Sequence, residues 1–266
     1  MNFRRAITFG WLMVALFGVN ISHAQSLPVV KMVICDGGDG SNPPGGTPIG
    51  QIFVNQWHSG PTLAPGDLLV QWNFGYTGDV PGEVVTGAEQ VPSGWKTLIS
   101  SRISHPLAPP GTEIFNLSAH AVSNPASEPS QWIFKVPTSA QGQYVENLAC
   151  IWDIENVRMA NPVQAVEFNS WNVNGAASLN PLVSKRSNSL ALALFIDDDY
   201  GFTLMTTPSG WFRPLANIGG FPSYNYPCCA IDGFALAMPS PGSTGAITTT
   251  MGIDSGYGVG VLLNGR

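Results

Sequence analysis

The chain has 266 residues, of which 11 are basic and 17 acidic, and its net charge at pH 7 is −6. A chain of this length buries roughly 70% of its unfolded surface, so it can form a sizeable core as one large domain or two small ones. The acidic balance, with no basic cluster after residue 24, argues against nucleic acid and anionic membrane surfaces as partners.

The first 24 residues have the layout of a secretory signal peptide. Arg4 and Arg5 precede an uncharged, mostly apolar run over residues 6–19, and Ser22-His23-Ala24 offers small residues to a signal peptidase. The run is shorter than the roughly 20 residues of a membrane-spanning helix, although an uncleaved anchor is the alternative. We expect cleavage after Ala24, no transmembrane segment in the mature chain, and a secreted, periplasmic, cell-surface or virion-surface location.

Residues 25–50 predict one strand and a connector. The segment from Val29 to Cys35 is apolar and rich in β-branched residues, which is typical of a strand. The Gly/Pro-rich stretch that follows has no periodicity. Asp36, Asp39 and Asn42 carry oxygen ligands for calcium, but their spacing fits no standard calcium loop, so a plain connector is favoured.

Residues 51–266 predict an all-β fold. Strand patterns recur about every ten residues, each bounded by Gly, Pro, Asn or Ser. They cover residues 51–57, 67–74, 95–100, 114–122, 131–136, 144–154, 163–171, 189–196, 202–205, 233–238, 246–253 and 258–264. No stretch keeps apolar residues at helical spacing for three turns. The pattern predicts an antiparallel, jelly-roll-like β-sandwich.

An internal duplication divides this region into two related halves, at about 66–157 and 188–264. Val91-Pro92-Ser93-Gly94-Trp95 returns 116 residues later as Thr207-Pro208-Ser209-Gly210-Trp211. Two further pairs of segments align, namely 66–74 with 188–196 and 119–122 with 235–238. The halves therefore predict either two sheets packed face to face or two sandwiches in tandem, and the first needs less edge protection.

The repeated motif predicts a chain reversal followed by a buried tryptophan. Proline presets φ near −65° at the first turn position, and glycine allows a conformation that other residues avoid. Burying a tryptophan removes about 150–250 Å² from water. We therefore expect Trp72, Trp95, Trp132 and Trp211 to lie in the core, between the stacked sheets.

These segments together resemble a β-sandwich module with repeated Pro-Ser-Gly-Trp turns, found in secreted bacterial proteins and in phage structural and tail-associated proteins. The resemblance rests on residues 66–70, 92–95, 127–129, 132–134, 189–195, 208–211, 241–250 and 258–263. It covers roughly residues 60–264 and implies a β-sandwich with no established catalytic residues. The Pro-rich insert at 104–111 and the Cys228-Cys229 pair depart from the usual pattern.

Four cysteines, Cys35, Cys150, Cys228 and Cys229, predict disulfides in an oxidising compartment. Direct neighbours rarely bond each other, because disulfide geometry asks for Cα atoms about 4.4–6.8 Å apart. The simplest arrangement ties Cys228 and Cys229 each to one of the two distant cysteines. Free buried thiols are an alternative, and the spacing does not favour a metal site.

Asp197, Asp198 and Asp199 form the one dense acidic cluster, at the end of an alternating strand. Three carboxylates there could bind calcium, the one cofactor that the sequence suggests, and two could act on a glycosidic bond if a partner carboxylate lies nearby. The simplest interpretation is a solvated strand end that blocks aggregation.

No motif predicts catalysis. The sequence has no Gly-x-Ser-x-Gly nucleophile elbow and no paired histidines for zinc. Trp57, His58 and Trp171 are the candidate ligand contacts, because an exposed tryptophan can stack on a sugar ring. The first hypothesis is a non-enzymatic extracellular or virion-type structural or interaction module with protein or glycan partners or with other copies of itself. The alternatives are a carbohydrate-binding module and a glycan hydrolase.

Overall fold

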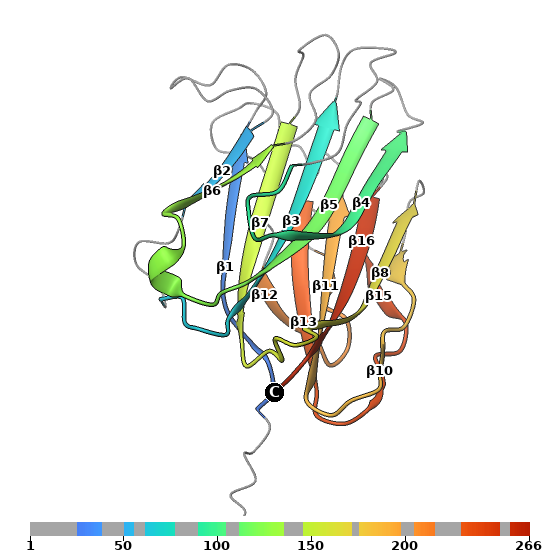
Figure 1. The fold of residues 1–266 in the computed structure, drawn as a ribbon. Coiled ribbons are helices and arrows are strands. Elements are labelled where there is room, and N and C mark those ends of the chain that lie inside the picture. The colour runs from blue at the N-terminus through green and yellow to red at the C-terminus, as the bar shows by residue number, and fades with distance from the viewer. Residues whose placement is uncertain are drawn as a thin grey trace, which may run out of the picture.

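The computed structural model describes residues 26–38, 51–55, 62–77, 90–104, 112–135, 146–171, 176–197, 205–215, 230–250 and 256–266. These residues form an antiparallel β-sandwich of two five-stranded sheets with three two-stranded ribbons (Figure 1). The described helical structure is a single 3-10 turn, η1 (Pro125–Ser127). Within the described ranges, no helix has the length and apolar content to cross a membrane.

Each sheet takes its strands from one half of the chain. The first sheet has the order β1 (Val29–Gly38), β7 (Glu146–Glu155), β3 (Leu68–Thr77), β5 (Thr112–Ala121), β4 (Lys96–Ser104). The second sheet, read from the edge that corresponds, has the order β8 (Val163–Trp171), β16 (Gly256–Asn264), β11 (Ser189–Asp197), β13 (Ala230–Met238), β12 (Phe212–Leu215). The predicted antiparallel β-sandwich built from two related halves is confirmed.

Two of the ribbons also correspond between the halves. The ribbons are β2 (Gln51–Asn55) with β6 (Gln131–Lys135), β9 (Ala176–Leu179) with β15 (Ile247–Thr250), and β10 (Val183–Ser184) with β14 (Gly242–Ser243). In the first half, β2 follows the sheet strand β1, and β6 precedes the sheet strand β7. In the second half, β9 follows β8, and β15 precedes β16 in the same way. The repeat therefore begins earlier than the sequence indicates, at β1 and β8.

The register and the turns repeat as well as the strand order. Leu68 pairs with Ala121 in the first sheet, and Leu190 pairs with Ala237 in the second, as the sequence alignment of the halves requires. In each Pro-Ser-Gly-Trp turn, the tryptophan N–H donates to the proline carbonyl at 3.1 Å. The glycine between them has a left-handed φ, +86° in the first turn and +83° in the second. These are the matched reversals that the motif predicts.

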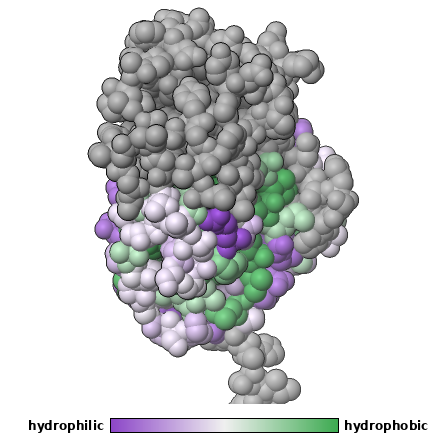
Figure 2. Space-filling model, turned by 180° about the vertical axis from the view of Figure 1, so that it is seen from behind, coloured by the Kyte–Doolittle hydropathy of each residue, from purple (hydrophilic) through white to green (hydrophobic). Residues whose placement is uncertain are grey.

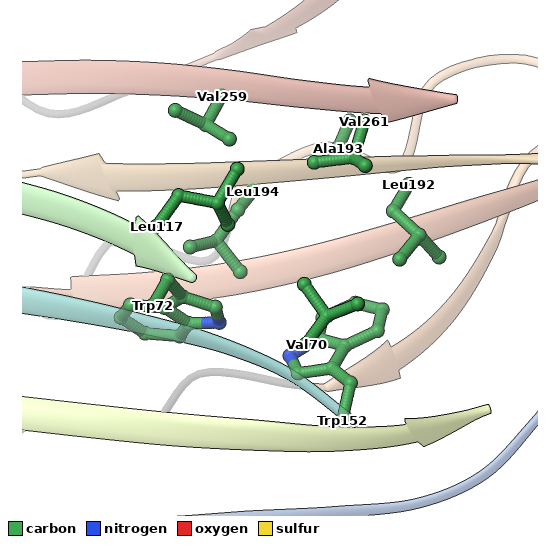
Figure 3. A pocket seen from close by; sticks show the side chains of 9 residues that line it. All are labelled: Val70, Trp72, Leu117, Trp152, Leu192, Ala193, Leu194, Val259 and Val261. Atoms are coloured by element: carbon green, nitrogen blue, oxygen red, sulfur yellow. The ribbon is translucent and has the colours of Figure 1, made fainter. Parts of the chain in front are cut away.

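The main core lies between the two sheets. Trp72 and Trp152 from the first sheet share one buried cluster with Leu192, Leu194 and Val259 from the second. The expected face-to-face packing is therefore the arrangement found. A cavity of about 20 Å³ remains between the sheets (Figure 3). Its walls are entirely apolar residues: Val70, Trp72, Leu117, Trp152, Leu192, Ala193, Leu194, Val259 and Val261.

The outer faces of both sheets are also buried, each beneath a ribbon. Trp95 and Trp132 pack with Phe134 on the outer face of the first sheet, and Trp211 packs in the corresponding cluster of the second. The expected burial of these tryptophans is confirmed, but their expected place between the sheets is wrong. The central sheet strands are buried on both faces, so the burial of a residue does not tell on which side of a sheet it lies.

Glycines let the ribbon of the second half approach its sheet closely. A Cβ on Gly258 would lie 3.0 Å from Leu179 of β9, and a Cβ on Gly260 would lie 3.2 Å from Leu182 just after β9. These glycines stand where the first sheet has Ala149 and Ile151, because β7 and β16 correspond. Small residues in β16 thus make room for leucines from the ribbon side.

The disulfide joins Cys35 to Cys150. These two cysteines are direct register partners on β1 and β7, so the bond links an edge strand to its neighbour within one sheet. The simplest arrangement expected from sequence, with Cys228 and Cys229 as partners, is therefore wrong for Cys35 and Cys150. Cys228 and Cys229 themselves lie outside the described residues.

Replacing Cys35 and Cys150 together by valine should lower the free energy of unfolding by about 4–5 kcal/mol, because the bond closes a loop of 115 residues in the unfolded chain. Urea unfolding with and without a reductant measures the effect. Reductant should weaken the parent and leave the double-valine variant unchanged. A control variant with serine at 228 and 229 should keep the full sensitivity, and loss of that sensitivity would contradict this assignment.

Candidate functional site

The sequence-predicted site residues fall mostly outside the described part of the chain. Trp57, His58, Asp198 and Asp199 lie there, so two of the three candidate ligand contacts and most of the acidic cluster stay predictions. Trp171 and Asp197 are the last residues of β8 and β11. Among the described residues, no group of three or more His, Cys, Asp or Glu side chains is placed to hold a metal ion.

The sheet register brings Trp171 and Asp197 into one row. Trp171 pairs with Gly256 at the start of β16, and Gly256 pairs with Asp197, which pairs in turn with Ala230. Neighbouring strands are about 4.8 Å apart, so the backbones of Trp171 and Asp197 lie about 10 Å apart across β16. We call these four residues the rim row. It combines an aromatic residue and an acidic one at one end of the second sheet.

The rim row lies at the end of the sandwich opposite the start of β1 and the C-terminus. Val29 begins β1, the first strand of the chain, beside Glu155, and Asn264 ends β16, the last strand, beside Ser189. We call this end of the sandwich the base. The Arg266 guanidinium donates to the carbonyls of Val157 and Gly66, which holds the last residue against the base. Figure 1 shows the C-terminus at that end and the strand ends of both sheets gathered at the other.

On the outer face of the first sheet, the side chain of His120 supports the first repeated turn. His120 Nδ1 lies 3.1 Å from the Gly94 carbonyl, and Nε2 lies 2.9 Å from Glu128 Oε1. The imidazole also stacks on Trp95, with ring centroids 5.4 Å apart. Because both ring nitrogens face acceptors within the protein, His120 ties β5, the turn and the residues after η1 together.

A cluster of amides and a hydroxyl occupies the same face further along β3 and β5. Gln71, Asn73, Asn116 and Ser118 are fully buried, and Ser118 Oγ donates to Gln71 Oε1 at 2.7 Å. Among the described residues, no hydrogen-bond partner is placed for the Asn116 amide. The cluster offers hydrogen bonds but presents no surface to a partner.

An ionic cluster links three strands at the base of the first sheet. Lys31 Nζ donates to Asp67 Oδ2 at 2.6 Å and to the Thr62 carbonyl at 3.2 Å, and it lies 3.1 Å from Asp153 Oδ2. Asp67 Oδ2 also accepts from the Ala64 N–H at 2.7 Å. The cluster thereby fastens β1 and β7 to the turn that leads into β3.

Burial controls the ionisation of this cluster. It raises the pKa of Asp153 to about 6, and the nearby charge of Asp67 adds to the rise, while Lys31 opposes it. Burial also lowers the pKa of Lys31, but its hydrogen bonds to Asp67 and Asp153 outweigh that effect and leave the pKa above its usual value. The sequence analysis missed this cluster, although single charged residues inside the apolar runs around Lys31 and Asp153 were a usable signal.

Comparison with protein-family models, with curated proteins and with solved structures finds no significant match to the chain. The functional interpretation therefore depends on the geometry of the chain itself.

A comparison of two single variants, Gly94→Ala and Gly210→Ala, tests the support that His120 gives to the first turn. Each alanine would have a left-handed φ, which costs about 1–2 kcal/mol. A Cβ at Gly94 would also lie 3.0 Å from His120 Cε1, whereas one at Gly210 would meet nothing within 4 Å. We expect the Gly94 variant to lose more free energy of unfolding in urea. Equal losses would show that His120 gives way freely and does not brace the turn.

Proposed function

We propose that the chain is a non-enzymatic extracellular or virion-surface interaction module whose contacts lie at the rim end of the sandwich. The observation that carries the proposal is that the ionisable clusters described above hold parts of the fold together. His120 and Glu128 brace a turn, and Lys31, Asp67 and Asp153 fasten strands. The cavity between the sheets has apolar walls with no group that could act as acid, base or nucleophile.

The arrangement of the ends supports display of the rim. The start of β1 and Arg266 both lie at the base, so the rim row is at the end of the sandwich away from them. Rims of β-sandwiches are well suited to recognition, because a rigid scaffold positions the residues at the strand ends. Trp171 and Asp197 are the described residues there that sequence analysis also selects.

The character of the surface agrees with contacts to proteins or glycans. Seen from the side opposite Figure 1, pale, weakly polar residues and one apolar band cover more of the described surface than strongly hydrophilic residues do (Figure 2). In the part of the chain whose burial is described, four large apolar side chains are exposed, namely Val29, Ile133, Val183 and Phe212. The proposal includes membership of the Pro-Ser-Gly-Trp module of secreted and phage structural proteins, which the two matched turns support.

Carbohydrate binding is the second candidate, and the rim row favours it. Sugar recognition commonly combines an aromatic ring that stacks on the pyranose with a carboxylate that accepts from its hydroxyls. The register places Trp171 and Asp197 about 10 Å apart, a separation that one or two sugar rings can span. The sequence alone supplies the two residues but not this spacing.

Trp171→Ala and Asp197→Asn should each abolish binding to a surface or glycan that the parent protein binds, because both residues lie in the rim row. Binding is measured on a glycan array, and self-association is measured by light scattering. Phe212→Ala is the matched control, since it removes an exposed aromatic residue from the other edge of the same sheet.

The outcomes separate the candidates. Array binding that is lost in the rim variants alone supports the carbohydrate-binding module, and self-association lost in the same variants supports an assembly module. A strict monomer that adheres to nothing contradicts the interaction module. Turnover of a glycan that disappears in Asp199→Asn would replace both by the hydrolase alternative.

A further inference from the structure

The ionic cluster at the base contains one more negative group than positive. Its members are Lys31, Asp67 and Asp153, whose side chains are 12%, 4% and 0% exposed. An unpaired charge out of contact with water is costly, and a buried group commonly becomes neutral instead. The composition of the cluster therefore favours one bound proton.

The two carboxylates are not equivalent in their contacts. Asp67 accepts short hydrogen bonds from Lys31 Nζ and from the Ala64 N–H, both to Oδ2. Asp153 has the longer contact with Lys31, at 3.1 Å, and its side chain is the more deeply buried of the two carboxylates, 0% exposed against 4% for Asp67. Burial disfavours the ionised form of a carboxyl group, and it raises the pKa of Asp153 to about 6. The proton therefore belongs on Asp153.

The second half of the chain builds the same corner without charge. Lys31 occupies a bulge in β1 between Val30 and Met32, and Gln164 occupies the corresponding bulge in β8. Gln164 Nε2 donates to Asn264 Oδ1 at 2.9 Å, and its Oε1 accepts from the Lys185 N–H at 2.7 Å. Both bulged residues thus hold the turn before the central strand of their sheet.

The positions around the bulge correspond too. Ser189 stands where the first half has Asp67, and Leu262 stands where it has Asp153, since Leu68 matches Leu190 and Ile154 matches Leu263 in the register. The corner of the fold therefore requires no ionisable group. The charges are a property of the first half alone.

We propose that Lys31, Asp67 and Asp153 form a proton-binding site at the base of the sandwich, where uptake of one proton by Asp153 stabilises the fold in mildly acidic surroundings. Among the residues that the structure describes, the charged groups facing Asp153 are Lys31 from β1 and Asp67 from the turn before β3. The nearby Arg266 guanidinium is held by the carbonyls of Gly66 and Val157.

The sign of the effect follows from proton linkage. Because the pKa of Asp153 is about 6 in the folded protein, against an ordinary value near 4, the folded state binds the proton more tightly than the unfolded chain. The stabilisation is complete below about pH 4 and is lost as the pH rises through 6. Acid should therefore stabilise the protein in this window, the reverse of the usual behaviour of a salt-bridged carboxylate.

Urea unfolding between pH 4 and pH 8 tests the site with Asp153→Asn and the control Glu155→Gln on the same strand. The folding equilibrium constant of the parent and of the control should fall by up to about 100-fold from pH 4 to pH 7 relative to the Asn variant. The Asn variant should be the most stable of the three at pH 7.5. An unchanged slope in the Asn variant, or its destabilisation at pH 7.5, would overturn the proposal.

Two measurements on the parent protein keep the test independent of whether the variant folds. The carboxyl carbon resonance of Asp153 should titrate near pH 6, and a midpoint below the ordinary aspartate value would overturn the proposal. Stability at pH 7.5 should be equal in sodium chloride and choline chloride of the same ionic strength. A gain specific to sodium would identify a metal cation, not a proton, as the species that balances the cluster.

Discussion

Burial of one sheet against the other is the interaction on which the whole structure depends. The inner face of each sheet carries large apolar side chains, and residues of both halves share one cluster. A sheet taken alone would expose that face, so neither half completes a core without the other. The ribbons then bury the outer faces, which gives four layers along the central strands. This two-sided burial explains why β11 reads as an almost unbroken apolar run from Ser189 to Asp197.

Within this shared frame, the two halves use different chemistry at the same positions. The Cys35–Cys150 disulfide of the first sheet corresponds to the apolar pair Phe168 and Val259 in the second. The buried pair Gln71 and Ser118 corresponds to Ala193 and Phe234. At these two places the first sheet relies on a covalent bond and a hydrogen bond where the second relies on packing. The frame tolerates both, because backbone pairing and inner-face burial are common to the two sheets.

Sequence patterns predict those parts of the fold that depend on local periodicity. The strands, the repeated turns and the burial of Trp95 and Trp211 all follow from alternation and from the Pro-Ser-Gly-Trp motif. The place of a tryptophan does not follow, because a strand that is apolar on both faces gives no sign of which face meets the other sheet. The β2–β6 ribbon, which covers one such face, is specified by pairing between residues about 80 positions apart. Local patterns contain no information on that pairing.

Spacing is what the sequence could not supply for any candidate site. The disulfide partner of Cys35 is set by the register of β1 on β7, over 115 residues. Lys31 and Asp153 meet for the same reason, and so do Trp171 and Asp197 across β16. In each case the residue types were visible and their proximity was not. Since the sheets fix these distances rigidly, the packed core sets the backbone position of a functional residue at a strand end. Chemistry at the rim can therefore change from one chain to another with no change in the packing beneath it, which is the physical reason to seek the function at the rim and the stability at the base.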